Sequence, residues 1–507
     1  MSMVINTNTA SLIAQAAQAK TNNAMETAME RLSTGKRINS ASDDAAGMAM
    51  ASRVESQIRG LTMAVRNAGD ASSLIDTAES AMAEQANMLQ RMRELAIQSS
   101  NGTNSVADRL AIQDEVSQLR SELDRISTTT SWAGNKLLDG SFTTKKFQVG
   151  SGAAETVSVS ITAQGSADLG VHRYDSTGTV NGNAATLVTD GASVKTVTDF
   201  DVLGKDGAAE ATFAAGSSAK TVAAAVNADS SSTGVTAQAI TLAKMSLSGV
   251  PEGTVSFSIN GGGTATAISE TVTSNDDLTS LKDAINSAAG STGVTADFYG
   301  TDKSFLVLTE ADGDDISITN FSDGGTTTTL DVGVGNFDGT SYATAISAPS
   351  IGTGANDIIV NGVVRMESTQ AFSISDQEAA AADVALALTG YLGASGSATS
   401  TATNVSGIDV STEAGARSAI SVLDGALEAV NETRGELGAT SNRLEYTINN
   451  LSSMVTNAGA SKSRIEDADF AVETSNLTKA QILSQAATAM LAQANASKQS
   501  VLSLLQG

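Results

Sequence analysis

The residues most suited to form a binding site are three closely spaced aspartates, Asp312, Asp314 and Asp315, in the run Ala-Asp-Gly-Asp-Asp. Carboxylates at this spacing could bind Ca²⁺, as they do at the start of an EF-hand loop. That loop also needs a glycine at its sixth position and a glutamate at its twelfth, whereas Ile316 follows the run directly. Neighbouring Asp and Gly residues are typical of tight turns, so the run predicts a hairpin turn rather than a metal site.

Other candidate catalytic groups are scarce, because the chain has one histidine, His172, and no cysteine. Cysteine-based and HExxH zinc sites and thiolate nucleophiles are therefore excluded. No nucleophile-elbow motif accompanies His172, and we predict a solvated loop histidine. Gly333, Gly335 and Gly339 stand between strand-like runs with no helix after them, which argues against a phosphate-binding loop. We predict that the chain is not an enzyme and has no cofactor.

Charge and hydropathy limit the partners of this chain. It has 507 residues, with 30 Lys and Arg against 55 Asp and Glu, and residues 151–400 alone hold 8 basic and 28 acidic side chains. Nucleic acid is excluded as a partner, because phosphate neutralisation requires a basic face. No run approaches the ~18 apolar residues of a membrane span, so no membrane insertion is expected. The first basic residue is Lys20, which argues against a cleavable secretory signal.

The elements that would carry any function begin with helices in the N-terminal part. Between residues 9 and 128 there is no proline, and apolar residues recur at helical spacing. The spacing predicts one helix ending at Gly35, a long one over 46–98, a turn at 101–104, and a third helix around 112–126. The apolar positions expected to form helix-packing seams for assembly are Leu61, Val65, Ile75, Met82, Leu89, Ile112, Val116, Leu119 and Leu123.

The C-terminal part repeats this pattern. Residues 416–458 keep a seven-residue apolar register, broken only by Arg434 and Ser441, which predicts a coiled-coil seam. A last amphipathic stretch over 477–502 has a second apolar stripe with Ile482 and Met490, too wide for one partner helix, so several partners are implied. The seam positions in these two stretches are Ile420, Leu423, Leu427, Val430, Leu444, Ile448, Leu451, Leu477, Leu491 and Val501.

The middle of the chain changes to short alternating runs separated by Gly-Gly, Asp-Gly and Asn-Gly, which predicts antiparallel β-structure. Ala225-Val226-Asn227, followed by Thr-Gly-Val-Thr-Ala, recurs 59 residues later as Ala284-Ile285-Asn286 followed by the same five residues. We expect one small α+β unit used twice.

These patterns predict a multidomain α+β protein, with a helical coiled coil and bundle formed by both chain ends and β-rich outer domains formed by the middle. Such a chain is expected to self-assemble through its helical ends and to present its middle outward. The expected divisions are residues 1–45 and 461–507 for the two halves of an inner coiled-coil domain, 46–150 and 406–460 for a helical core domain, and 151–405 for the outer domains, with the repeat around 219–245 and 278–304.

The sequence resembles bacterial flagellins at both ends and in order. The segments that carry the resemblance are RLSTGKRINSASDDAAGMAMASR at 31–53, LQRMRELAIQSSNGTNS at 89–105, NKLLDGSF at 135–142 and RIEDADFAVETSNLTKAQILSQAATAMLAQAN at 464–495. The 59-residue repeat is similar to a module of the outer domains of flagellins and hook-associated proteins. The long matches cover about half of the chain.

The resemblance implies a structural subunit that self-assembles into the extracellular flagellar filament for swimming motility. It implies export through the flagellar type III pathway without a cleavable signal, and ends that fold on polymerisation. Other flagellin subunits, an export chaperone, and cap and junction proteins are the implied partners. The vertebrate Toll-like receptor for flagellin is a further implied partner, at the matching positions Arg91, Leu95 and Glu115. Because Leu89, Met92 and Ala96 form a packing stripe, Arg91 and Leu95 are expected on a more exposed face.

Three alternatives belong to other classes of protein. A hook–filament junction protein shares the helical ends but is made in few copies, and the unbroken match at 464–505 favours the filament subunit. A non-flagellar surface adhesin would usually have a secretory signal. A flagellin carrying an inserted protease would need HExxH, which a single histidine excludes.

Overall fold

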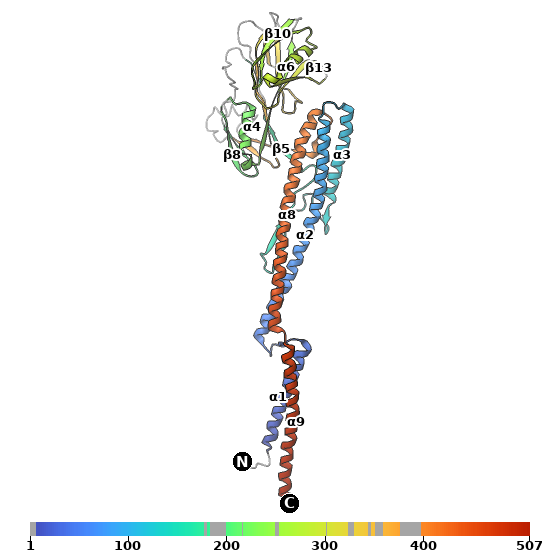
Figure 1. The fold of residues 1–507 in the computed structure, drawn as a ribbon, viewed down its shortest axis with the longest axis vertical. Coiled ribbons are helices and arrows are strands. Elements are labelled where there is room, and N and C mark those ends of the chain that lie inside the picture. The colour runs from blue at the N-terminus through green and yellow to red at the C-terminus, as the bar shows by residue number, and fades with distance from the viewer. Residues whose placement is uncertain are drawn as a thin grey trace. The chain divides into compact units, whose positions relative to one another are not determined.

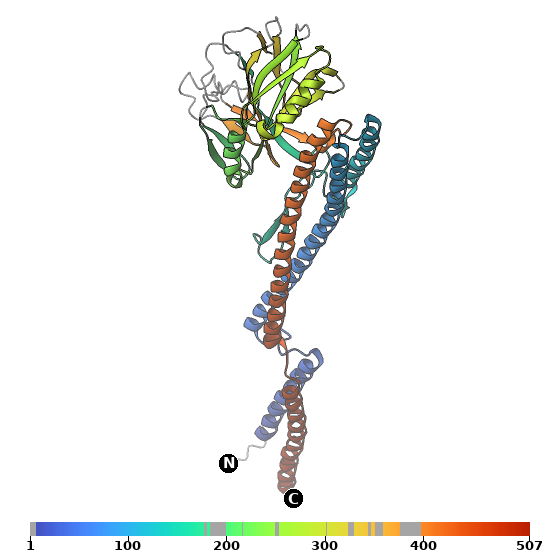
Figure 2. The same ribbon diagram turned by 45° about the horizontal axis from the view of Figure 1, so that its top comes forward.

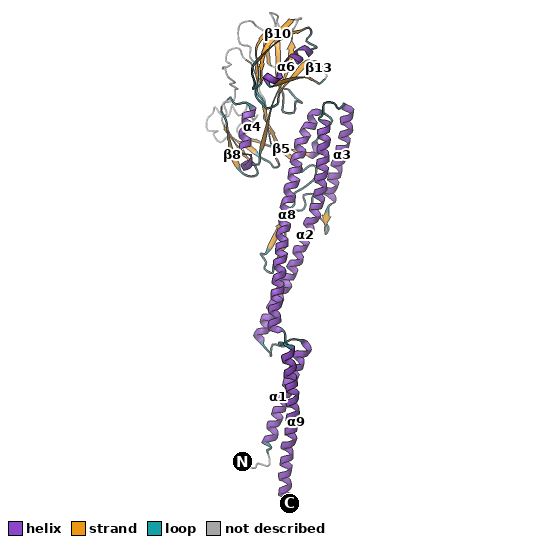
Figure 3. Cartoon of the chain, in the orientation of Figure 1, coloured by secondary structure: helices purple, strands orange, loops and turns teal. Residues whose placement is uncertain are grey.

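Both ends of the chain are helical and its middle is built of strands, which confirms the predicted α+β class (Figures 1 and 3). The computed structural model describes residues 7–176, 180–182, 199–214, 216–248, 253–300, 302–322, 329–342, 346–349, 358–375 and 397–506. The chain divides into two compact units. The terminal unit comprises residues 1–76, 144–160 and 437–507, and the central unit comprises residues 77–143 and 161–436.

In the terminal unit, the two ends of the chain pair as helices. Helix α1 (Thr9–Thr34) begins after Asn8, whose side-chain oxygen accepts a hydrogen bond from the N–H of Ser11. It ends at Gly35, whose φ of 70° is the left-handed conformation that glycine adopts without strain, as the sequence predicts. Helix α1 packs along α9 (Phe470–Gln506), and both views show them side by side (Figures 1 and 2).

A crossover of backbone hydrogen bonds, residues 35–38 against 465–468, joins the two chain ends next to this helix pair. The N–H of Arg37 donates to the carbonyl of Glu466 (2.7 Å), and the N–H of Ala468 donates to the carbonyl of Gly35 (2.9 Å). The guanidinium of Arg37 also donates to the carbonyl of Ile465 (2.7 Å). The two non-helical segments, one between α1 and the next helix and one before α9, therefore satisfy their backbone hydrogen bonds by bonding to each other.

Two long helices run through both units. Helix α2 (Ala45–Ser99) and helix α8 (Glu413–Glu466) match the predicted long helix and the predicted seven-residue register. Within the terminal unit, a small apolar cluster of Leu61, Ala64 and Leu451 packs the two helices together. A hairpin of β3 (Lys145–Gln148) and β4 (Thr156–Val159) lies on α2, where the side chain of Asn67 donates to the carbonyl of Gln148 (3.0 Å).

In the central unit, helix α3 (Val106–Thr129) joins the adjacent parts of α2 and α8, and the three lie side by side in Figures 1 and 2. Ser105 and Asp108 form a reciprocal capping box at the start of α3. After α3 the chain makes a two-residue turn at Ala133 (φ 48°) and Gly134 (φ 84°) between β1 (Ser131–Trp132) and β2 (Asn135–Lys136).

The strand-rich part of the central unit contains three larger sheets, and every pairing among the described strands is antiparallel. The five-stranded sheet has the order β11 (Thr266–Val272), β10 (Gly253–Asn260), β14 (Ile316–Ser322), β17 (Ile358–Val360), β6 (Val180–Gly182). The eight-stranded sheet has the order β12 (Val294–Tyr299), β13 (Asp302–Glu310), β9 (Thr236–Ser248), β18 (Val363–Ser368), β5 (Gly170–Asp175), β21 (Thr401–Asn404), with β15 (Thr329–Val334) on β9 and β16 (Ile346–Pro349) on β15. The four-stranded sheet has the order β20 (Ser397–Thr399), β19 (Ser373–Ser375), β7 (Asp199–Leu203), β8 (Ala208–Thr212).

The two copies of the 59-residue repeat fold alike, as strand, strand, helix, strand. The first is β7, β8, α4 (Ala219–Ala228) with the short α5 (Ser230–Thr233), and β9, and the second is β10, β11, α6 (Thr279–Thr292) and β12. In each copy, an asparagine near the helix end makes two hydrogen bonds to the backbone of the following strand. Asn227 bonds Ala237 (2.7 and 2.8 Å) and Asn286 bonds Ala296 (2.8 and 2.8 Å). The recurring asparagine is therefore a structural clamp in both copies.

Strand β9, thirteen residues long, contributes to two hydrophobic cores. Its first part places Ala237 in the core that also holds Val222 and Phe200. Its second part places Ala243 and Met245 in the core around β10, β13 and α6. One strand therefore completes the interiors of both copies of the repeat.

The aspartate run does not form the predicted hairpin. It does form a turn, but the turn joins β13 to β14, which belong to different sheets and are not paired with one another. The carboxylate of Glu310 accepts the N–H groups of Asp312 (3.2 Å) and Asp314 (2.6 Å), and the ammonium of Lys220 pairs with both aspartates (3.2 and 2.9 Å). These interactions satisfy the polar groups of the turn without pairing β13 with β14. The chain can therefore pass from one sheet to the next.

His172 lies inside strand β5 and is partly buried, so the prediction of a solvated loop histidine is wrong. The glycine-rich sequence around it conceals a strand that has Val171 and Arg173 on its buried face. Burial lowers the pKa of His172. Across the part of the chain that the structure describes, no helix combines the length and hydrophobicity that crossing a membrane requires.

Candidate assembly surfaces and receptor face

Most of the predicted seam residues pack inside the subunit itself. The fully buried ones are Leu61, Ile75, Met82, Leu89, Val116, Leu123, Leu423, Val430 and Leu444, and Ile112 and Leu451 are nearly so. The partly buried ones are Val65, Leu119, Ile420, Leu427, Ile448, Leu477 and Leu491, while the side chain of Val501 lies outside the described residues. These seams hold the helices of one chain together, which fixes the surfaces that the subunit offers to others.

On α8 the seven-residue spacing of buried residues continues through the stretch in which Arg434 and Ser441 interrupt the apolar pattern. Val430, Leu437, Leu444 and Leu451 are buried at intervals of seven residues. Arg434, which takes an apolar position in the predicted register, lies 3.6 Å from the carboxylate of Glu79. A charged residue is tolerated there because its guanidinium reaches the rim of the seam.

Helices α1 and α9 leave a wide apolar surface uncovered. We call this set of exposed side chains the terminal apolar face. On α9, Ile482 is 60% and Met490 is 63% exposed, which confirms that the second stripe is left open in a single chain. On α1, Ile13 is 70% exposed. The other members of the terminal apolar face are Leu12, Met29, Phe470, Val472 and Leu483. Apolar area on this scale is costly in water, so it favours burial against further helices.

Ion pairs flank the crossover. Glu55 of α2 pairs with Lys462 of α8 and with Arg59 (2.7 Å) on its own helix. The hydrogen bond from Lys462, followed by that from Arg59, lowers the pKa of Glu55 to about 2. Nearby, Lys36 pairs with Glu466 (2.5 Å). The pairs Glu55–Lys462 and Lys36–Glu466 join the N-terminal and C-terminal parts of the chain. No sequence pattern pointed to them, because the partners are far apart in the sequence.

Arg91 and Glu115 lie together on a solvated face of α2 and α3. Their side chains form an ion pair (2.8 Å) and are about half exposed, and Arg91 also pairs with Glu94 (3.1 Å). Leu95, in contrast, is 2% exposed, so the expectation that it lies on the open face is wrong. It follows Met92 by three residues, and α2 packs against two helices here, so the buried stripe is wider than one seam.

Paired terminal helices with an uncovered apolar face define a class of protein whose ends complete their packing in an assembly. Comparison with known proteins specifies the class. Residues 5–143 match the bacterial flagellin N-terminal helical region, residues 420–505 match the bacterial flagellin C-terminal helical region, and residues 199–249 and 256–312 each match the flagellin hook IN motif. The last two segments are the two copies of the repeat.

Full-length relatives agree with these matches. B-type flagellin of Pseudomonas aeruginosa is 40% identical over 506 residues, and Flagellin C of Vibrio cholerae is 35% identical over 505 residues, each covering 100% of both chains. A solved structure of FliC from Burkholderia pseudomallei aligns over 74% of this chain and 99% of that chain at 20% identity, with a TM-score of 0.29.

The chain belongs to the bacterial flagellin family. It is a structural subunit of the flagellar filament, which lies outside the cell. Whole-length identity to flagellins supports this function over that of a junction protein.

Proposed function

We propose that subunits of this flagellin polymerise by burying the terminal apolar face of α1 and α9 against the same helices of neighbouring subunits. The exposure of Ile13, Ile482 and Met490 in the single chain carries this proposal. Ordering a residue costs about 1–2 kcal/mol, so helices this exposed gain from neighbours that cover them. The same reasoning predicts that residues 1–40 and 475–507 are cut faster by protease in the monomer than in the filament.

A pair of matched substitutions on α9 tests the polymerisation surface. Met490→Asp places a charge on the terminal apolar face and is expected to abolish filament formation while leaving a folded monomer. Gln481→Asp adds the same charge at an exposed polar position on the opposite side of the same helix from Met490 and should still polymerise. Electron microscopy and sedimentation measure assembly. Filaments from Met490→Asp, or their loss in both variants, would contradict the proposal.

The two ends and the middle are expected to contribute differently to assembly. Deletion of residues 475–507 should abolish filaments, and deletion of much of 160–400 should be tolerated, because the strand-rich part folds around cores of its own. The reverse result would assign polymerisation to the middle of the chain.

We also propose that the chain is exported by the flagellar type III pathway without a cleavable signal, and that an export chaperone covers α9 until export. Cap and junction proteins are further proposed partners. The exposed apolar side chains of α9 support a chaperone role, because they need cover in the cytoplasm. Filament protein should retain its encoded N-terminal residues by mass spectrometry. Because the family is structural, we propose that the chain is not an enzyme.

Recognition by the vertebrate Toll-like receptor for flagellin is proposed for the face of Arg91 and Glu115. Their half-exposed ion pair supports it, and Leu95 is proposed to hold the helix in place beneath them. Arg91→Ala should weaken signalling at least tenfold, about 1.4 kcal/mol, because arginine often dominates small interfaces.

Arg93→Ala is the matched control, because Arg93 is also partly exposed on α2 but pairs with Asp424 on α8. A reporter assay on folded monomers measures the response, and thermal melting identifies variants such as Leu95→Ala that act through stability. Undiminished signalling from both Arg91→Ala and Glu115→Ala would reject this face.

A further inference from the structure

The chain enters and leaves the strand-rich part of the central unit through a two-stranded neck, β5 paired with β21. The pairing runs from Gly170 opposite Asn404 to Arg173 opposite Thr401. A side chain at Gly170 would overlap the carbonyl of Thr403, so glycine is required for this close approach. Two adjacent strands thus form one ribbon at the passage between helices and sheets.

The neck lies directly on α8. A methyl group at Gly425 of α8 would overlap the Cγ1 atom of Val171, so the missing side chain makes a notch that the valine fills. Val171 is 4% exposed. The notch sets the distance between the neck and the helix.

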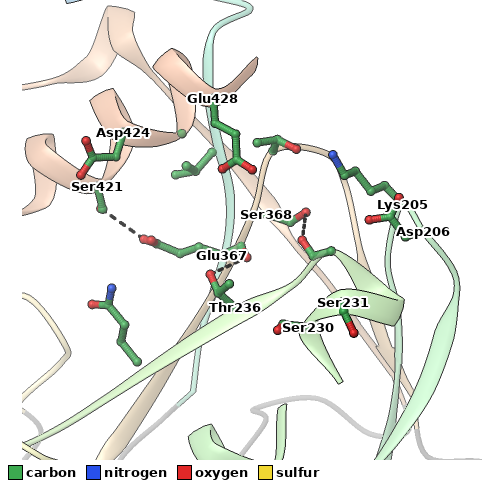
Figure 4. Close-up of a pocket in the computed structure, with 15 residues that line it drawn as sticks. Lys205, Asp206, Ser230, Ser231, Thr236, Glu367, Ser368, Ser421, Asp424 and Glu428 are labelled. Atoms are coloured by element: carbon green, nitrogen blue, oxygen red, sulfur yellow. Dashed lines mark hydrogen bonds between the residues drawn. The ribbon is translucent and has the colours of Figure 1, made fainter. Parts of the chain in front are cut away.

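Arg173 fastens the neck beside this notch, and its side chain is nearly completely buried. Its guanidinium donates to the carboxylate of Glu367 on β18 (2.7 Å) and to the hydroxyls of Ser418 (2.9 Å) and Ser421 (2.6 Å), one turn apart on α8. The Ser421 hydroxyl also bonds Glu367 (3.2 Å), as Figure 4 shows. A buried charge that loses such partners is strongly destabilised, so the arrangement favours one geometry.

Around this fastening the joint is open and polar. A cavity of about 520 Å³ lies between α8 and residues of β9, β18, α5 and the turn from β7 to β8. In Figure 4, Ser421 and Glu428 of α8 lie across it from Glu367 and Ser368. The side chains that line this cavity are therefore mainly polar.

We propose that Arg173 is a positioning residue that locks the strand-rich part of each subunit to α8 in one orientation, with Val171 in the Gly425 notch as its pivot. The outer parts of the filament are then carried as fixed bodies rather than as tethered, swivelling ones. The observation that carries the proposal is the engagement of one buried guanidinium by groups from both sides of the joint.

Distance measurements between spin labels test the lock, because the chain has no cysteine of its own. Gln118→Cys on α3 and Ala224→Cys on α4 are exposed sites on the two sides of the joint. Double electron–electron resonance on the full-length monomer should give one narrow distance distribution. Arg173→Gln should broaden it at least twofold. Arg417→Gln, which removes an exposed ion pair within α8, should leave it unchanged.

Two milder variants protect the test against misfolding. Ser418→Ala with Ser421→Ala removes the hydroxyls of α8, and Gly425→Ala fills the notch with a single methyl group. Each should broaden or shift the distribution while the melting temperature of the helical part is retained. An unchanged narrow distribution in all three variants would overturn the proposal. Broadening in Arg417→Gln as well would also overturn it, because the joint would then respond to any change on α8.

Discussion

At the scale of single residues, ion pairs between distant parts of the chain define the terminal unit. Arg31 of α1 pairs with Glu473 of α9 (3.1 Å), and Glu55 of α2 pairs with Lys462 of α8. Glu473 is buried, so its charge depends on its partner more than that of an exposed glutamate does. The pairs select one pairing of the two chain ends among the many that apolar stripes alone permit.

The Glu55 pair makes stability depend on pH in acid. The folded pKa of Glu55 is about 2, below the usual value of 4.5, so its contribution is complete above pH 4.5 and is lost as the pH falls towards 2. Glu55→Gln should flatten the change of melting temperature over this range. Glu445→Gln, at an exposed position of α8, should keep the wild-type slope. Equal slopes for wild type and Glu55→Gln would show that the pair does not contribute.

Ala133 holds a left-handed conformation, with φ 48°, in the turn between β1 and β2. A side chain with a Cβ atom pays for this conformation, whereas glycine adopts it freely. Ala133→Gly should stabilise the monomer by about 1 kcal/mol. Ala133→Val should destabilise it, because a branched side chain crowds the backbone further. Urea denaturation checks both, and equal midpoints for the two variants would contradict the assignment.

Among the helices and strands, the seven-residue register of α8 identifies the positions at which a substitution should lower the free energy of unfolding most. Leu444 is fully buried in it, and Leu444→Ala should cost about 2–5 kcal/mol. Ser441 also occupies a register position but is only partly buried, so Ser441→Ala should change stability little. Thermal melting of the two variants measures the difference. Similar losses in both would mean that the seam is not the source of stability.

The helices could be predicted closely from sequence, because their information is local. The interval from Ala46 to Gln98 differs by one residue at each end from α2, and Gly35 ends α1 as expected. Leu95 was misplaced because helical spacing shows which residues share a stripe but not how many neighbours a helix has.

Sheet pairing could not be predicted in the same way. The run at Asp312 has the composition of a turn. It connects two different sheets because β13 pairs with β9 and β14 pairs with β17, and these partners are distant in the sequence. The lock at Arg173 was missed for the same reason, since Glu367 and Ser418 come near it only through folding. No spacing in the sequence distinguishes such an arginine from a solvated one.

At the scale of the whole molecule, acidity concentrates in residues 151–400, with 28 acidic against 8 basic side chains. We therefore expect neighbouring subunits in a filament to repel one another through this region, with salt screening the repulsion over ~10 Å at 0.1 M. Assembly should be faster at moderate than at low salt, as light scattering would show. A chain lacking most of 160–400 should lose this dependence, and faster assembly of the complete chain at low salt would contradict the argument.

Strand β9 has a consequence for how such subunits diversify. Because Ala237 completes one core and Met245 the other, a genetic exchange that replaces one copy of the repeat brings half of a foreign strand into the neighbouring core. Overpacking or a void follows at once. Recombinants that still fold should therefore have their endpoints outside residues 199–312, and the two copies should be inherited as one block.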